Sequence, residues 1–205
     1  MDKARIAVLV SGGGTNLQAL IDAQDTGILS SGRIRLVISN NPGAYALQRA
    51  SSAGIDSAVV TKNNCGSQQM FEAAIKKLLR DHEIDVIVLA GFMSILSADF
   101  TGTYPNRILN VHPSLIPAFC GKGYYGLRVH EEALKYGVKV TGATVHFVNE
   151  IPDGGEIIFQ KAVEVLEEDT PETLQRRVME QAEWIILPAA TEKVCRKIIS
   201  NRQKG

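Results

Sequence analysis

The chain has 205 residues, of which 45% are hydrophobic, so it can bury a substantial core. Its 22 Lys and Arg balance its 22 Asp and Glu, and this zero formal charge removes any global electrostatic reason to bind nucleic acid or an acidic membrane. Its three cysteines are far apart in the sequence, which argues against a disulfide framework or a structural zinc site and fits reduced thiols in a cytoplasmic protein.

Signals for strands and helices alternate through the first half of the chain. Four short apolar runs are typical of buried strands: Ile6–Val10, Ile34–Ser39, Ser57–Val60 and Asp85–Leu89. Apolar residues at helical spacing predict three helices between them: Thr15–Ala23, Ala46–Ala53 and Gln68–Arg80. This alternation predicts a parallel sheet wound with helices. The longest apolar stretch, Val86–Ala98, is shorter than the ~20 residues that span a bilayer, which argues against a transmembrane helix. The first apolar run, Ile6–Val10, is shorter than the roughly 7–15 residues of a signal-peptide core.

The second half of the chain has a different pattern. Its periodicity predicts a helix over Leu127–Tyr136. Three further strands are predicted over Arg107–Leu109, Thr141–Val148 and Glu156–Leu166, and the last two are expected to be antiparallel. Thr170 and Pro171 are typical of a helix start, and the long final helix contains Pro188, where we expect a break or a kink. We therefore predict a single α/β domain over 1–205, Rossmann-like and doubly wound. Its sheet is mostly parallel, with an antiparallel C-terminal portion and a long C-terminal helix.

A glycine-rich loop, Ser11–Asn16, follows the first predicted strand and opens the first helix. Backbone N–H groups in such a loop can approach an anion, and a helix N-terminus favours negative charge, so the loop indicates a phosphate site. It is not a Walker A loop, because no Gly-Lys-Ser/Thr follows, and it does not match Gly-x-Gly-x-x-Gly, because Leu17 occupies the last glycine position. The alternative is a tight strand–helix turn in which Thr15 or Asn16 caps the helix.

The segment Asn110–Pro117 has the strongest catalytic signal. Asn110 and His112 lie two residues apart at the end of a strand, so their side chains point to the same side of the sheet. An amide and an imidazole aimed at one place favour catalysis over the alternative of a buried core histidine. A carboxylate is also needed, and Asp153 is the leading candidate, although its Asp-Gly dipeptide is equally typical of an ordinary turn.

Other segments have less definite patterns. The segment Ala90–Ser97 is too apolar for an ordinary loop; it could line a pocket for a flat aromatic ligand, but its composition favours core packing. Among the remaining histidines, His130 is expected to be structural and His82 to lie at a solvated helix end. His146 shares a side of its strand with Thr144 and is a candidate to support the catalytic residues from behind.

Together these motifs resemble the glycinamide ribonucleotide formyltransferase family of purine synthesis. They occur in the order of that family and span nearly the whole chain: Val10–Ala19, Leu89–Leu96, Asn110–Pro117, His146–Val148 and Asp153–Gly155. The Asn-x-His-Pro-Ser-Leu-x-Pro motif is shared with other folate-dependent formyltransferases and hydrolases, whereas the N-terminal loop narrows the resemblance to the ribonucleotide enzyme. The resemblance implies a formyl transfer from 10-formyltetrahydrofolate to the amine of 5-phosphoribosylglycinamide, without a metal.

The resemblance also implies roles for individual residues. Asn110, His112 and Asp153 would be catalytic, and the substrate would be held by Gly14, Thr15, Asn16 and Glu183. The folate would contact Asn110 and a further set of residues: Gln68, Met93, Ser94, Ile95, Leu96, Val148 and Asn149. Residues 1–100 would form the phosphate-binding half and 101–205 the folate-binding and catalytic half. Some family members carry Arg where this chain has Gln68 and Ser94, and the segment Ala118–Gly126 is longer than in some members.

The implied mechanism is direct attack of the amine on the formyl carbon. Asn110 would donate to the developing oxyanion, and His112 would add a second donor if Asp153 keeps it charged near neutral pH. His112, Asp153 and water would carry the proton to the leaving nitrogen.

Three other functions are alternatives to formyl transfer to the ribonucleotide. A formyltetrahydrofolate hydrolase and a methionyl-tRNA formyltransferase usually carry further domains, which we do not expect here, and a non-catalytic nucleotide-binding module would be expected to have lost part of the trio. The partners implied are small molecules rather than nucleic acid or a membrane, and a homodimer stays an alternative to a monomer.

Overall fold

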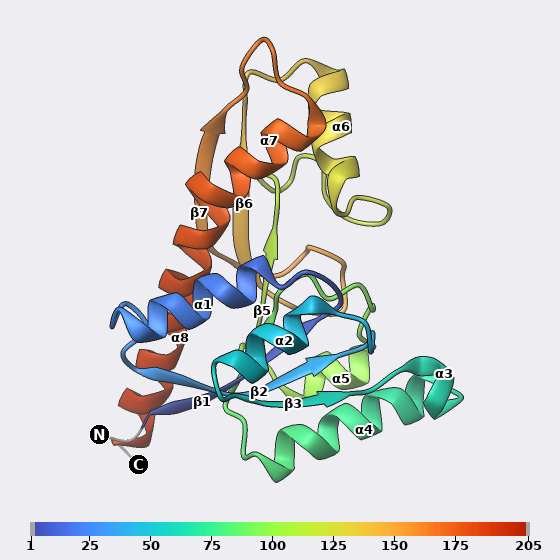
Figure 1. The fold of residues 1–205 in the computed structure, drawn as a ribbon, viewed down its shortest axis with the longest axis vertical. Coiled ribbons are helices and arrows are strands. Elements are labelled where there is room, and N and C mark those ends of the chain that lie inside the picture. The colour runs from blue at the N-terminus through green and yellow to red at the C-terminus, as the bar shows by residue number, and fades with distance from the viewer. Residues whose placement is uncertain (1–2, 204–205) are drawn as a thin grey trace.

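The computed structural model describes residues 3–203, which form one seven-stranded sheet and the helices around it (Figure 1). The strands are β1 Ala4–Val10, β2 Gly32–Ser39, β3 Asp56–Val59, β4 Val86–Leu89, β5 Ile108–His112, β6 Val140–Phe147 and β7 Ile157–Glu164. The α-helices are α1 Thr15–Asp25, α2 Tyr45–Ser52, α3 Lys62–Cys65, α4 Gln68–Asp81, α5 Ala98–Thr103, α6 Leu127–Tyr136, α7 Pro171–Val178 and α8 Trp184–Arg202. A π-helical turn, Met179–Glu183, joins the last two.

The strand order is β3-β2-β1-β4-β5-β6-β7. The five strands from β3 to β5 are parallel to their neighbours, whereas β6 pairs antiparallel with β5 and β7 pairs antiparallel with β6. The chain winds outward from β1 in one direction and then returns to β4 on its other side, so the point of reversal lies between β1 and β4. The predicted doubly wound, mostly parallel sheet with an antiparallel C-terminal part is confirmed.

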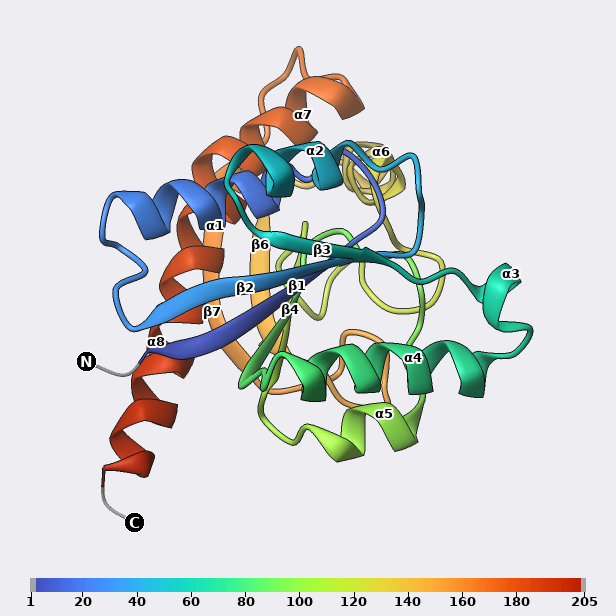
Figure 2. The same ribbon diagram turned by 60° about the horizontal axis from the view of Figure 1, so that its bottom comes forward.

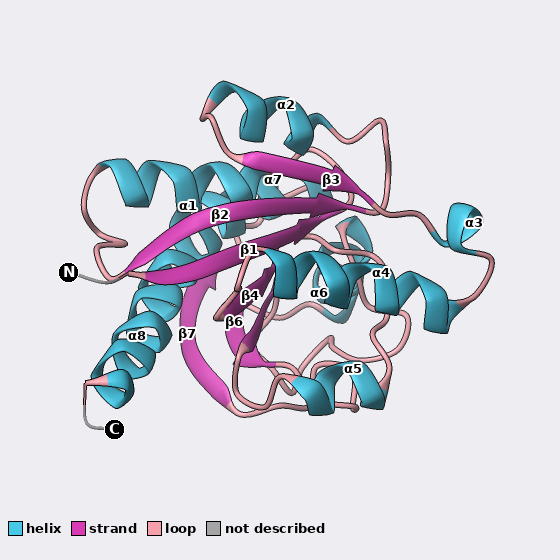
Figure 3. Ribbon diagram, turned by 90° about the horizontal axis from the view of Figure 1, so that it is seen from below, coloured by secondary structure: helices cyan, strands magenta, loops and turns pink. Residues whose placement is uncertain are grey.

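Two hydrophobic clusters pack on the two faces of the sheet, between its strands and the helices that flank it in Figures 2 and 3. Strand β1 contributes to both, because alternate side chains point to opposite faces: Ile6 and Val8 pack under α1 and α8, whereas Ala7 and Leu9 pack against α4 and α5. Burial on both faces explains why β1 and β4 are nearly continuous apolar runs. Figure 3 shows α1 and α2 on one side of the sheet and α4 and α5 on the other.

Most predicted elements match the observed ones to within a few residues, and α6 has the predicted bounds. The short helices α3 and α5 were not predicted, because each is only one or two turns long and too short to show helical periodicity in the sequence. The start of α7 is as expected: Thr170 accepts a hydrogen bond from the Thr173 backbone N–H, and Pro171 occupies the first helical position.

The expected break at Pro188 is not observed, since α8 continues through this residue. The irregularity lies one turn earlier, in the π-helical turn Met179–Glu183. A proline inside a helix removes one hydrogen bond and crowds the carbonyl four residues before it, which here belongs to Trp184. The wider turn places Glu183 on the inner side of the helix, where it is buried.

Candidate functional site

A cavity of about 640 Å³ opens at the carboxyl ends of β1, β4 and β5. In open α/β sheets this is where ligands bind, beside the point at which the strand order reverses. Eight of the residues expected to act in catalysis or binding line this cavity: Asn16, Met93, Ser94, Ile95, Asn110, His112, Asp153 and Glu183. The fold thus brings together side chains that lie up to 167 residues apart in the sequence.

Asn110, His112 and Asp153 converge in this cavity. The His112 Nδ1 atom lies 3.6 Å from Asp153 Oδ2, and Asn110 Nδ2 lies 3.5 Å from Asp153 Oδ1. Strand β5 places the first two side chains two residues apart, whereas Asp153 comes from the loop between β6 and β7. The predicted convergence of an imidazole, a carboxamide and a carboxylate is therefore present in the fold, while their catalytic roles stay a prediction.

The loop that carries Asp153 depends on Gly155. A Cβ atom at this position would lie 1.7 Å from the Phe147 carbonyl oxygen, so no larger residue fits without moving the backbone. The loop closes through a hydrogen bond of 2.9 Å from Phe147 N–H to the Glu156 carbonyl. Asp153 itself has a positive φ of 56°, a conformation that Asp tolerates better than most residues. Asp153 therefore occupies an Asp-Gly turn and also supplies the candidate catalytic carboxylate, so the two interpretations of this residue do not exclude each other.

The charges of His112 and Asp153 are set by burial and by their neighbours. Burial lowers the pKa of His112, and this effect outweighs the nearby Asp153 carboxylate and the Phe119 carbonyl, which both raise it. The expectation that Asp153 keeps His112 charged near neutral pH is therefore wrong for this arrangement. For Asp153, burial acts to raise the pKa, but the imidazoles of His146 and His112, in their protonated forms, and the Gly121 N–H together lower it below its usual value. The pair thus holds an ionised carboxylate beside a neutral imidazole.

His146 supports the site from behind, as expected. Its Nδ1 atom lies 2.8 Å from the Phe147 carbonyl, which can only accept, so Nδ1 carries the proton. Its Nε2 atom then accepts from Asn110 Nδ2 at 3.2 Å and lies 3.6 Å from Asp153 Oδ1. This arrangement orients the Asn110 amide, whose NH₂ group faces His146 and, at a longer distance, Asp153.

The opposite wall of the cavity is formed by α1, α7 and the π-helical turn. The Asn16 side chain donates a hydrogen bond of 2.7 Å to Glu183, and both residues are buried. Burial raises the pKa of Glu183 to about 7, against the opposing effect of the Asn16 hydrogen bond. Glu183 was expected to contact the substrate, and its place in the cavity is compatible with that prediction.

The glycine loop leaves the N-terminus of α1 without a capping side chain. Gly14 is the residue before the helix, with a φ of 72°, and a Cβ there would approach the Ala46 Cβ to 2.6 Å. The alternative that Thr15 or Asn16 caps the helix is wrong, because no side chain does so and Asn16 turns to Glu183 instead. The first N–H groups of a helix lack partners within it, so this end can receive an anion.

The apolar segment after β4 divides between the cavity and the core. Met93 and Ile95 are 56% and 73% exposed in the cavity wall, whereas Leu96 belongs to the core on the α4 face. Core packing is therefore confirmed for Leu96, and Met93 and Ile95 line a cavity, while a flat aromatic ligand beside them stays a prediction. Ser94 lines the cavity and accepts a hydrogen bond of 2.8 Å from Asn40.

Five other predicted binding residues lie outside the cavity lining: Gly14, Thr15, Gln68, Val148 and Asn149. Gln68 donates to Glu72 at 2.6 Å and to the Ile95 carbonyl at 3.1 Å, so it holds the wall segment from the outside. Val148 packs against the core and donates its backbone N–H to the Ile108 carbonyl. Their predicted contacts with ligands stay predictions.

The structure adds residues that the sequence analysis did not select. His130, expected to be structural, is buried in the cavity wall; neither ring nitrogen has a hydrogen-bond partner in the described part of the chain. Burial, assisted by His112, lowers the pKa of His130 to about 4, so it is neutral at physiological pH. Helical spacing puts His130 on the buried face of α6 with Ala133. That spacing could have indicated burial, but not that this face meets the cavity.

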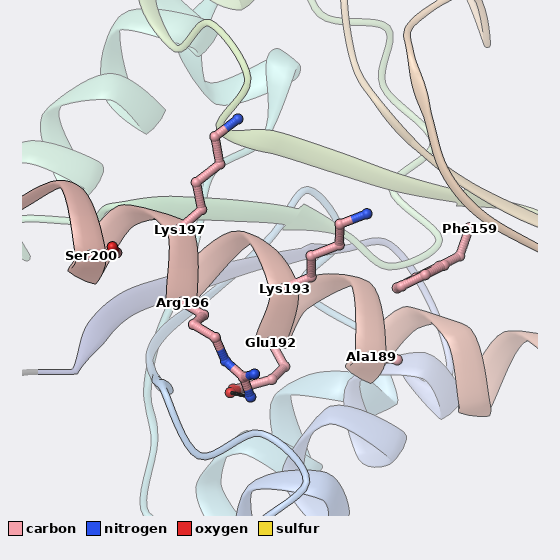
Figure 4. Close-up of a pocket in the computed structure, with 7 residues that line it drawn as sticks. All are labelled: Phe159, Ala189, Glu192, Lys193, Arg196, Lys197 and Ser200. Carbon is pink, nitrogen blue, oxygen red and sulfur yellow. Dashed lines mark hydrogen bonds and ion pairs between the residues drawn. The ribbon is translucent and has the colours of Figure 1, made fainter.

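A second hollow lies on the outer side of α8 (Figure 4). Figure 4 shows Lys193 as the side chain nearest to Phe159, Lys197 projecting from the same helix further along, and Arg196 turned toward Glu192. Arg196 binds Glu192 at 3.0 Å, and the Lys193 ammonium lies 4.9 Å from the centre of the Phe159 ring. None of the residues that line it comes from the strand ends that form the cavity, so it is separate from the candidate site.

Residues 3–203 were considered for two further features, a metal site and a membrane-spanning helix, and neither is present in this range. No group of three or more His, Cys, Asp or Glu side chains in this range is arranged to hold a metal ion. None of the helices described is both long enough and apolar enough to cross a bilayer.

Comparisons with known proteins agree with this geometry. The family model described as formyl transferase matches residues 4–191. The phosphoribosylglycinamide formyltransferase of Haemophilus influenzae is 44% identical over 183 residues, which cover 89% of this chain and 84% of that protein. The crystal structure of glycinamide ribonucleotide transformylase 1 from Symbiobacterium toebii has a TM-score of 0.86 at 44% identity, with 93% of this chain and 86% of that chain covered.

Some relatives are much longer than this chain. The trifunctional purine biosynthetic protein adenosine-3 of Gallus gallus is 43% identical over 204 residues, which cover 100% of this chain but 20% of that protein. The chain therefore spans a small part of that relative.

Proposed function

The chain belongs to the formyl transferase family, and we propose that it transfers the formyl group of 10-formyltetrahydrofolate to the amine of 5-phosphoribosylglycinamide in purine synthesis. The observation that carries the proposal is the convergence of Asn110, His112 and Asp153 in one cavity, with the Asp153 carboxylate 3.6 Å from the imidazole. Named relatives with this activity cover most of the chain, which supports the choice of substrates. Three free cysteines support the cytoplasm as its compartment.

The cavity and the neighbouring N-terminus of α1 offer surfaces suited to the two substrates. The exposed apolar side chains of Met93 and Ile95 provide a surface for the flat ring of the folate. The N-terminus of α1, with the loop through Gly14, Thr15 and Asn16, suits the phosphate of the ribonucleotide. Asn110, His112 and Asp153 line the same cavity as Asn16, Met93 and Ile95, so an amine and a formyl group held there would meet beside the trio.

The residues of the trio divide the chemistry between them. Negative charge develops on the formyl oxygen as the amine adds, and an N–H of the Asn110 amide can stabilise it. The N–H directed at Asp153 spans 3.5 Å, the longer of its two contacts, so it is the one available to turn toward this oxygen. The neutral His112 can accept the proton released by the amine, and the Asp153 carboxylate stabilises the resulting imidazolium. The imidazolium then returns this proton to the folate nitrogen, which leaves as its bond to the formyl carbon breaks.

Formyl-folate consumption, followed by absorbance with and without the ribonucleotide, tests the proposal. We expect consumption only when 5-phosphoribosylglycinamide is present. His112→Ala should lower turnover by roughly 10²–10⁴-fold, the usual contribution of a proton-transfer group, while both substrates still bind. His82→Ala is the control, because His82 ends α4 through a bond of 2.9 Å to the Leu78 carbonyl and lies outside the cavity.

Two results would contradict the proposal. Consumption that does not require the ribonucleotide would indicate a hydrolase. Wild-type turnover in His112→Ala would remove the imidazole from the mechanism.

A further inference from the structure

The turn after Pro117 contacts both members of the candidate acid–base pair through its backbone. The Phe119 carbonyl oxygen lies 2.8 Å from His112 Nε2. Two residues later, the Gly121 N–H donates a bond of 2.8 Å to Asp153 Oδ2. The turn thus joins β5 to the β6–β7 loop at the two groups whose relative position the proposed chemistry needs.

The first of these contacts decides which nitrogen of His112 carries the proton. A carbonyl oxygen only accepts, so Nε2 must donate and holds the single proton of the neutral ring. The Asp153 carboxylate competes for this proton from the other side, through Nδ1. The contact at Nδ1 is 3.6 Å, beyond normal hydrogen-bond length, whereas the contact at Nε2 is 2.8 Å. Nδ1 is therefore left as the basic nitrogen, next to the carboxylate that stabilises it once it is protonated.

The carbonyl reaches His112 because of an uncommon backbone conformation. Phe119 has a φ of 49°, in the left-handed region that bulky residues rarely adopt. Its ring packs against two tyrosines, with ring centres 6.4 Å from Tyr124 and 5.9 Å from Tyr136. The turn is also tied at its start, where the Ser114 hydroxyl donates to the Ala118 carbonyl at 2.6 Å. Aromatic packing of this kind can offset the backbone strain.

We propose that Phe119 is a positioning residue, whose packed ring holds the turn so that its carbonyl fixes the Nε2–H form of His112 while Gly121 holds the Asp153 carboxylate. The inference rests on the proposed function, because the protonated nitrogen matters only if His112 moves a proton. It concerns a segment that distinguishes this chain from shorter members, and it assigns that segment a part in orienting the trio.

The nitrogen NMR shifts of the histidine rings test the inference without any activity measurement. The chain has four histidines, so the ring signals are few, and the loss of one set in His112→Asn identifies that residue. Spectra are recorded at about pH 8, above the ordinary histidine pKa of ~6.5. We expect Nε2 of His112 to carry the proton and Nδ1 to have the shift of an unprotonated nitrogen. A proton on Nδ1 in the unmodified protein would overturn the proposal.

Variants of Phe119 then test the role of the ring. Phe119→Ala removes the packing but keeps the strain, so the carbonyl should leave His112 and the Nδ1–H form should appear. Phe119→Gly also lacks the ring, but glycine adopts a positive φ freely and should keep more of the Nε2–H form. Phe119→Tyr should resemble the wild type. Phe159→Ala is the control, because it removes a half-exposed ring outside the cavity.

Kinetics give a second measurement. Phe119→Ala should lower kcat on the order of 10–100-fold, as expected for a small misplacement of catalytic groups, with little change in KM. Its pH–rate profile should shift to lower pH, because the carbonyl contact raises the pKa of His112. The other groups that face this ring are Asp153, His146 and His130, and the variant leaves them unchanged. An unchanged profile together with an unchanged tautomer would refute the proposal.

A comparison of alanine variants at two glycines distinguishes the loss of the Asp153 contact from a general disturbance of the turn. Gly121 and Gly123 both have positive φ, 84° and 93°, and a Cβ at either position meets no atom within 4 Å. Only Gly121 donates to Asp153. Gly121→Ala should therefore lower kcat more than Gly123→Ala, and equal losses would contradict the assigned contact. If the wild type transfers no formyl group yet shows the Nε2–H form, the proposed function fails while the geometry stands.

Discussion

The two walls of the cavity each carry a carboxyl group, which is half-buried in Asp153 and buried in Glu183, and the two groups have opposite character. Asp153, on the wall formed by β5 and the β6–β7 loop, has a lowered pKa. Glu183, on the wall formed by α1 and the π-helical turn, has its pKa raised to about 7. Burial acts in the same direction on both, toward the neutral acid.

Their hydrogen-bond and charge partners account for the difference. Asp153 faces two imidazoles at 3.6 Å and a backbone N–H at 2.8 Å, whereas Glu183 receives a single amide hydrogen bond at 2.7 Å. Several partners that favour the ionised form overcome the cost of burial, and one partner does not. One cavity therefore combines a fixed negative charge on its catalytic wall with a carboxyl group that can gain or lose a proton near neutral pH on its other wall.

Removal of the fixed charge tests the catalytic wall and should have the largest effect. We expect Asp153→Asn to lower turnover by roughly 10²–10⁴-fold, because the imidazolium form of His112 loses its stabilising anion. The His112 pKa should fall further, since Asp153 raises it, so the pH–rate profile should move to lower pH. A profile that coincides with the parent would show that the two groups are not coupled. Asp99→Asn, at an exposed residue paired with Lys76, is the control.

The opposite wall is tested by the pH dependence of stability. The Glu183 carboxyl loses its proton near pH 4.5 when unfolded and near 7 when folded. Between these values the unfolded chain releases a proton that the folded protein keeps, so the free energy of unfolding falls as pH rises, by up to roughly 3 kcal/mol. Glu183→Gln should remove this slope while it keeps the acceptor for Asn16. The contribution of Asp153 to the pH dependence of the free energy of unfolding has the opposite sign. Its ionised carboxylate stabilises the folded protein above pH 3.8, and this stabilisation is lost as pH falls through its lowered pKa.

Urea unfolding at several pH values measures these slopes. Glu180→Gln provides the control for Glu183, because Glu180 is an exposed glutamate in the same π-helical turn. An equal slope in the wild type and in Glu183→Gln would mean that the carboxyl is ionised throughout, and the contrast between the two walls would disappear.

The smallest expected effect concerns the backbone of the glycine loop that precedes α1. Gly14→Ala places a Cβ at a φ of 72° and 2.6 Å from the Ala46 Cβ, so we expect a loss of about 1–3 kcal/mol of stability. Gly13→Ala meets no atom within 4 Å and should change stability by less than about 0.5 kcal/mol. Thermal unfolding of both variants compares them directly, and equal melting temperatures would show that the loop relaxes around the added methyl group.

Much of this molecule is predictable from local sequence. Apolar runs mark the buried strands, helical spacing marks α1, α4 and α6, and Thr170-Pro171 marks the start of α7. Asn110 and His112 could be paired because alternation along a strand is a local rule. Asp153 followed from the need for a carboxylate and from the resemblance to a known family. Such features depend on residues within a few positions of one another, or on motifs that recur.

The properties that depend on distant partners were decided only by the tertiary structure. No local pattern indicates that the Phe119 carbonyl meets His112, that His130 reaches the cavity wall, or that a π-helical turn rather than a break precedes Pro188. The direction of the pKa shift of Asp153 and of Glu183 is likewise set by how many groups from other elements approach the carboxyl. Sequence determined which chemical groups this protein carries and on which elements, and packing determined their protonation and orientation, because both depend on distances between segments far apart in the chain.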